Sequence, residues 1–113
     1  FFLNVHEGPH AISKGNTVIF KEGMIVSNEP GYYEKNKFGI RIENLIYVKK
    51  NRHKNYFENL TMAPIDKELI DLNIMNKTEI NWLNNYHKKV FNNIHKFMNK
   101  KELVELKKSC SAI

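Results

Sequence analysis

The hydrophobic period of the chain changes near Pro64, and this change constrains the fold more than any other feature. Before it, apolar and polar residues alternate in short runs such as residues 39–48. After it, apolar residues recur at helical spacing, as in residues 80–98. Alternation is typical of a half-buried strand, and the wider spacing is typical of one face of a helix. The first part is therefore not expected to be helical, and the second is not expected to form strands. The pattern therefore predicts an α+β fold in which antiparallel strands are followed by C-terminal helices.

The first part, residues 1–62, is predicted to be strand-rich. Its β-prone runs end at turn signals or at a basic turn over residues 49–54, and their spacing is that of hairpins. The spacing therefore indicates a mostly antiparallel sheet. The predicted strands cover residues 2–6, 23–29, 39–48 and 56–62, with turns at Gly8-Pro9 and Pro30-Gly31.

The second part, residues 63–113, is predicted to be a helical extension. Asn76 and Glu79 have the spacing of a capping box, so the main helix is expected to begin near Asn76. Its apolar stripe runs through Ile80, Leu83, Tyr86 or His87, Val90, Phe91, Ile94, Phe97 and Met98. A short helix is expected over about residues 101–109, where it buries Leu103, Val104 and Leu106, and a single helical turn is expected at residues 66–70.

Composition places the chain among globular proteins. It has 113 residues, of which 42% are hydrophobic and 27% are charged. No apolar run approaches the roughly 18 residues needed to cross a bilayer, so no membrane partner is expected. The single cysteine, Cys110, excludes an internal disulfide and fits a reducing compartment.

The net charge of +6 comes almost entirely from lysine, with 16 lysines and 2 arginines. A nucleic-acid surface usually clusters basic residues among stacking aromatics, whereas these lysines are scattered. A solvated surface therefore explains them better. A nucleic-acid partner, which would show salt-dependent binding, is not expected.

Three polar side chains in the strand-rich part could carry chemistry. Glu29 stands where an apolar strand ends, before Pro30, and the alternative is a solvated strand-end acid. Glu43 lies in a run with apolar neighbours, where a charge is costly unless it is paired or bound to a metal. The alternative is an ion pair with Arg41 on the same strand face. Two carboxylates on neighbouring strands would suit manganese, magnesium or calcium.

His6 is the third candidate, at the end of the first predicted strand. A lone histidine is more often a structural hydrogen-bonding residue, so that alternative stays open. His53, His87 and His95 lie in the basic turn or on the predicted helix without acidic neighbours. We interpret these three as structural or surface residues.

Three blocks in order resemble those of the Xaa-Pro aminopeptidases (aminopeptidase P). They read FLNVHEGP at residues 2–9, GMIVSNEPGYY at residues 23–33 and FGIRIEN at residues 38–44. Residues 60–65 and 82–87 resemble the segment after the catalytic blocks in the larger, cytosolic type. The resemblance covers about residues 1–95, and all three blocks in order are highly specific.

The resemblance implies a pita-bread metallopeptidase domain, of which this chain is the C-terminal portion, with two divalent metal ions, usually Mn²⁺. Glu29 would ligate one metal and Glu43 would bridge both. His6 would bind substrate and help stabilise the tetrahedral intermediate, and Arg41 would orient the carboxylates. The metals would polarise the scissile carbonyl and activate a bridging hydroxide, with Glu29 as general base.

The resemblance also implies that the chain is a fragment. Two aspartates and a histidine of the family's metal site would lie upstream of Phe1, so the isolated chain is expected to bind metal weakly and to lack activity. Its partners would be the remainder of the same enzyme, a second copy in a homodimer and a peptide with proline in second position. A cytoplasmic location is expected by the same resemblance.

A non-catalytic pita-bread module that binds peptides or proteins is the alternative from another class. Retention of Glu29 and Glu43 argues against it, because a non-catalytic descendant has no physical reason to keep a carboxylate in a buried strand. Two upstream aspartates about one strand apart would favour the enzyme.

Overall fold

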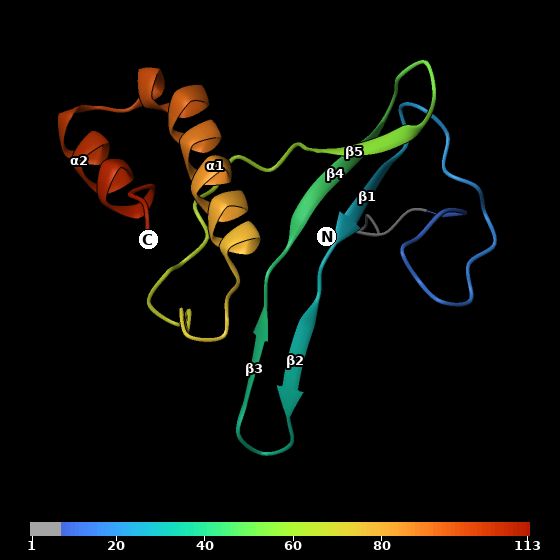
Figure 1. Cartoon of the computed structure of the whole chain (residues 1–113), viewed down its shortest axis with the longest axis horizontal. Coiled ribbons are helices and arrows are strands. Elements are labelled where there is room, and N and C mark those ends of the chain that lie inside the picture. Colours follow the sequence, from blue (N-terminus) through green and yellow to red (C-terminus); the bar gives the residue numbers. More distant parts are fainter. Residues whose placement is uncertain (1–7) are drawn as a thin grey trace, which may run out of the picture. The chain divides into compact units, whose positions relative to one another are not determined.

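A computed structural model of the chain describes residues 8–113, in two compact units that divide between Thr61 and Met62 (Figure 1). All paired strands are antiparallel, and the helices follow them, so the predicted α+β class is confirmed. The predicted strand at residues 2–6 lies outside the described residues. The elements are β1 (Ile25–Asn28), β2 (Gly31–Glu34), β3 (Phe38–Arg41), β4 (Asn44–Lys50), β5 (Asn55–Asn59), α1 (Lys77–Ile94), a 3₁₀ turn η1 (His95–Phe97) and α2 (Lys100–Ser109).

The strand-rich unit contains a sheet of order β1-β4-β5 and the separate hairpin β2-β3. The single strand predicted over residues 39–48 is wrong, because β3 ends at Arg41 and β4 begins at Asn44. Pro30 faces the break. It has no N–H to donate to a facing strand, although its carbonyl accepts a hydrogen bond from the N–H of Ile42 at 3.2 Å. The ladder is therefore interrupted without a change of direction.

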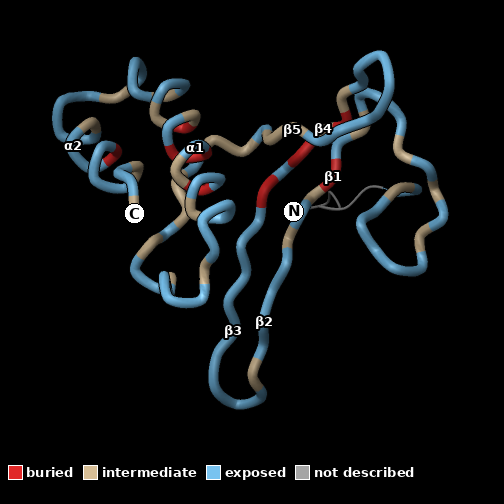
Figure 2. Tube along the Cα trace, viewed as in Figure 1, coloured by how far each residue is buried: buried red, intermediate tan, exposed pale blue. Residues whose placement is uncertain are grey.

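The turn predicted at Pro30-Gly31 is likewise wrong, since Gly31 is the first residue of β2. The chain turns later, between Glu34 and Phe38, where Asn36 has a positive φ of 61°. Asparagine tolerates this left-handed backbone better than most residues. Most of the hairpin is exposed (Figure 2).

The core of this unit lies along β4. Ile46 and Val48 alternate with more exposed residues and are 6% and 1% exposed, and Val26 of β1 is buried beside them. Strand geometry points every second side chain to the same face, which explains the pattern (Figure 2). The predicted basic turn is confirmed between β4 and β5, where the Asn51 N–H donates to the Lys54 carbonyl.

The helical unit is organised around α1. The predicted capping box is confirmed: the side chain of Asn76 accepts from the Thr78 and Glu79 N–H groups, and that of Glu79 accepts from the Asn76 N–H. A second capping box joins Asn99 and Glu102 at the start of α2. No helix within residues 8–113 is both long and apolar enough to cross a membrane.

The core of the helical unit is formed by Leu83, Tyr86 and Val90, all from α1. The predictions that Phe97 and Val104 belong to the core are wrong, because both side chains are exposed. Residues 66–70 form turns instead of a helical turn. There the Asp66 carboxylate accepts a hydrogen bond from the Glu68 backbone N–H, which competes with helical bonding.

His87 is fully buried in α1, which confirms a structural role. Its Nε2 accepts a hydrogen bond from the backbone N–H of Ile65 at 3.1 Å, so the ring ties the segment before α1 to the helix. Burial lowers the pKa of His87 below its ordinary value of 6.5, and the charge of Lys67 lowers it further. The native unit therefore favours the neutral ring.

The stability of the helical unit is expected to fall as the pH drops below 6.5, the ordinary His87 pKa. The unfolded chain takes up the His87 proton first, because the native pKa is depressed, so this contribution is complete above that pH and is lost below it. The pH-dependent stability can be measured by hydrogen exchange of α1 peptides in the protein that carries this chain. The exchange is compared at pH 7.5 and 5.5 after correction for the intrinsic exchange rates. His87→Gln should flatten the dependence, while His95→Gln, an exposed control, should not. Equal pH dependence in all three proteins would contradict the assignment.

Candidate metal centre

The two predicted carboxylate ligands occupy facing positions on neighbouring chain segments. Asn28 faces Asn44 at the end of the β1–β4 pair, and Gly31 faces Arg41 at the start of the β2–β3 pair. The register is the same on both sides of the break. Glu29 and Glu43, which lie within it, therefore stand opposite each other.

This arrangement brings two like charges together, which Arg41 balances in part. Like charges directly opposite on paired strands destabilise a sheet. Carboxylate oxygens are the ligands that hard divalent cations prefer, and one cation between two carboxylates offsets their repulsion. The donor set of Glu29 and Glu43 therefore fits a divalent metal.

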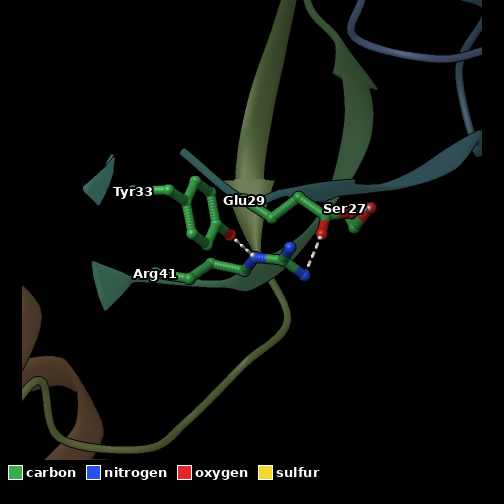
Figure 3. Close-up of polar contacts among 4 residues, drawn as sticks. All are labelled: Ser27, Glu29, Tyr33 and Arg41. Atoms are coloured by element: carbon green, nitrogen blue, oxygen red, sulfur yellow. Dashed lines mark hydrogen bonds and ion pairs between the residues drawn. The ribbon is translucent and has the colours of Figure 1, made fainter. Parts of the chain in front are cut away.

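Glu29 is held from two sides (Figure 3). Its Oε1 accepts a hydrogen bond from Ser27 Oγ at 2.7 Å, and its Oε2 accepts one from Arg41 Nη1 at 3.0 Å. Ser27 precedes it by two residues on an extended segment, so both side chains lie on the same face. Arg41 reaches it from the facing strand. The carboxylate orientation is thus set by both strands.

Arg41 makes a second contact with Tyr33. Its Nε–H donates to Tyr33 Oη at 2.7 Å, and the guanidinium carbon lies 5.8 Å from the centre of the ring. This contact with Tyr33 is the main cause that raises the pKa of Arg41, and the charges of Glu29 and Glu43 raise it further. The guanidinium is therefore a permanent positive charge beside the carboxylates.

Two glycines make room for the Tyr33 ring. A Cβ on Gly31 would lie 2.7 Å from Tyr33 Oη, and one on Gly39 would lie 2.6 Å from Tyr33 Cδ1. Gly31 precedes Tyr33 by two residues, and Gly39 faces it across the hairpin. The ring can cross the backbone toward Arg41 because both positions lack a side chain.

Glu43 differs from its predicted setting. It lies in the break between β3 and β4 and is exposed, and its neighbours Ile42 and Leu45 are 45% and 44% exposed. The prediction of a buried strand position is therefore wrong, because the ladder is interrupted opposite Pro30. The alternative considered for Glu43, an ion pair with Arg41, is not formed, since Arg41 pairs with Glu29.

The residue after Glu43 anchors this end of the site. Asn44 is buried, and its Nδ2 donates to Asn59 Oδ1 at 3.2 Å, which links the start of β4 to the end of β5. The N–H of Leu45 donates to Thr61 Oγ1 at 2.8 Å. These contacts fix the backbone on which Glu43 stands.

A groove of about 850 Å³ runs beside β1, and Glu29 is among the residues that line it. Ser27, Pro30 and Leu45 line it too, together with residues of the loop at 8–12. The held carboxylate therefore borders a space large enough for a small ligand.

The site is partial within the described residues. His6 lies outside them, and residues 8–113 contain no group of three or more His, Cys, Asp or Glu side chains that could hold a metal.

The sequence pattern did not predict that Ser27 and Tyr33 belong to the site. The two-residue spacing of Ser27 from Glu29 on a predicted strand could have identified the first. Nothing in the pattern pointed to Tyr33, since the hairpin β2-β3 was not predicted.

Family comparisons cover almost the whole chain. A family described as "Metallopeptidase family M24" matches residues 2–50. A second, described as "C-terminal region of peptidase_M24", matches residues 55–113. The two matches follow each other in the order of the strand-rich and helical parts.

The chain is similar to several aminopeptidases. It is 47% identical over 102 positions to "Aminopeptidase P2" of Arabidopsis thaliana, covering 81% of this chain and 14% of that protein. It is 48% identical over 113 positions to "Probable Xaa-Pro aminopeptidase P" of Tuber melanosporum, covering 90% of this chain and 18% of the relative. The chain therefore spans less than a fifth of the length of these relatives.

A solved structure shares the fold. It is the X-prolyl aminopeptidase of Caenorhabditis elegans, described as a cytosolic enzyme with a di-nuclear active site. The match has a TM-score of 0.83 and 34% identity, and it covers 98% of this chain and 20% of the other. This likeness confirms the predicted portion of a pita-bread domain. The chain belongs to the metallopeptidase family M24, in which it matches a segment of the Xaa-Pro aminopeptidases.

Proposed function

We propose that the chain supplies the carboxylate side of the active site of an Xaa-Pro aminopeptidase. Such an enzyme releases the N-terminal residue from peptides that have proline in second position. The observation that carries the proposal is the facing pair Glu29 and Glu43 with Arg41 beside it. The names of the relatives and the di-nuclear site described for the C. elegans protein support the same activity.

Glu29 and Glu43 would hold two divalent metal ions, with Glu29 on one ion and Glu43 between both. Manganese is the proposed metal, since carboxylate oxygens suit it. When bound, the ions would polarise the scissile carbonyl and lower the pKa of a water molecule at the site. Two carboxylates are too few to complete such a site, so the remainder of the same enzyme would supply the other ligands.

Residues of this chain would also transfer a proton, orient the ligand and bind the substrate. Glu29 would accept a proton as general base, because its carboxylate borders the groove. Arg41 would keep that carboxylate in one orientation and balance its charge. His6 would bind the substrate and stabilise the charge that develops on its oxygen; this role comes from the family resemblance.

The proposal extends to the setting of the enzyme. A cytoplasmic location is supported by the description of the C. elegans protein as cytosolic. A homodimer is carried over from the family resemblance. A non-catalytic binding module remains the competing function, and an assay of peptide hydrolysis separates the two.

Replacing Glu43 with Gln is expected to lower kcat/KM for an Xaa-Pro-Yaa peptide by more than about 100-fold, because loss of a ligand exceeds the usual cost of losing an outer partner. The assay uses the enzyme that carries this chain, loaded with manganese, and its metal content is measured by mass spectrometry. Glu34→Gln, on the hairpin strand β2, is the control that should stay active. Near-normal turnover of the Glu43 variant would show that the bridging assignment is wrong.

Replacing Arg41 with Lys is expected to lower kcat/KM by about 10–100-fold, although the charge is kept. A lysine ammonium is a single point, whereas the guanidinium fork donates to Tyr33 and Glu29 at once. Arg52→Lys, in the exposed turn after β4, is the matched control and should be silent. Equal activity of the Arg41 and Arg52 variants would show that the charge of Arg41 is sufficient and that its two hydrogen bonds are not needed.

A further inference from the structure

We propose that Ser27 is a positioning residue that aims the Glu29 carboxylate at the metal site. This inference rests on the proposed function. The Ser27 hydroxyl donates to that carboxylate from the same chain segment as Glu29, whereas Arg41 donates to it from the facing strand. The family resemblance assigned no role to Ser27.

The contact is short and partly shielded. Ser27 Oγ lies 2.7 Å from Glu29 Oε1, within the range of strong hydroxyl–carboxylate hydrogen bonds. Both residues are half-buried. Ser27 belongs to β1, which is paired with β4 along its whole length, so the hydroxyl is carried by a rigid backbone. The donor is therefore fixed more firmly than a long surface side chain would be.

The two donors occupy different oxygens of Glu29 (Figure 3). With Ser27 on Oε1 and Arg41 on Oε2, the carboxylate plane cannot rotate without breaking one of them. An ionised carboxylate has about four acceptor sites, so these two hydrogen bonds do not use all of them. The clamp thus leaves Glu29 able to ligate a cation in one fixed orientation.

Without Ser27, Oε1 of Glu29 would lose its hydroxyl donor, and Arg41 on Oε2 would have to carry more of the restraint. Half of the Arg41 side-chain surface is open to solvent, and its guanidinium also donates to Tyr33. Loss of the hydroxyl should let the Glu29 side chain sample other rotamers in the adjoining groove. Metal binding would then have to supply the ordering that the apo-protein now provides, and affinity would fall.

The test compares Ser27→Thr with Ser27→Val in the enzyme that carries this chain. The two replacements have nearly the same shape and strand preference, but only threonine keeps the hydroxyl. The Mn²⁺ dissociation constant of the metal-free protein is measured by competition with a fluorescent chelator. The valine variant should bind Mn²⁺ about 10–100-fold more weakly, and the threonine variant within about threefold of the unmodified protein.

Further readouts separate positioning from general damage. Melting temperatures of the metal-free forms should agree, and kcat should follow metal occupancy, with the valine variant recovering at high Mn²⁺. Ser27→Ala repeats the loss of the hydroxyl with a smaller side chain, and Ser13→Ala is an exposed control. Equal Mn²⁺ affinity of the threonine and valine variants in an active enzyme would overturn the role of Ser27 alone. Absence of metal binding and hydrolysis in the unmodified enzyme would overturn the proposed function and this role with it.

Discussion

The structure of the strand-rich unit depends on one antiparallel register that continues through an interruption. β1 and β2 form one arm, and β3 and β4 form the other, with Pro30 responsible for the gap between them. Proline removes one ladder hydrogen bond but leaves the direction of the chain unchanged. Glu29 and Glu43 therefore lie outside the regular strand ladder, and the paired strands on either side keep them opposite each other.

The Glu29 carboxylate in this gap is held by hydrogen bonds from the hairpin β2-β3 and from β1. Arg41 joins the Glu29 carboxylate to Tyr33, and the Tyr33 ring lies over Gly31 and Gly39, where an added Cβ would force the ring to shift. Ser27 adds a neutral donor from the same strand. The carboxylate is therefore ordered before any cation binds, which reduces the ordering cost of binding. The helical unit has its own core and its own capping boxes.

Predictions from local pattern succeeded where the pattern has a single physical reading. Asn76 and Glu79 have a spacing that satisfies the free N–H groups of a helix start, and the capping box forms as expected. The alternation over residues 39–48 predicted a half-buried strand, and Ile46 and Val48 of β4 are buried. The same alternation failed at Ile42 and Glu43, because it continues unbroken across a gap that the facing residue, Pro30, imposes. Val104 failed for a related reason, since helical spacing does not show how wide the covered stripe is.

The sequence by itself determined the α+β order, the helix starts and the identity of the two candidate carboxylates, since these follow from residue type and spacing along one segment. The tertiary structure decided that Glu29 and Glu43 face each other, that Arg41 pairs with Glu29, and that Ser27 and Tyr33 join the site. Most of those relations depend on which residues meet across two strands. Register is a property of the pair, so the pattern of either strand alone does not contain it.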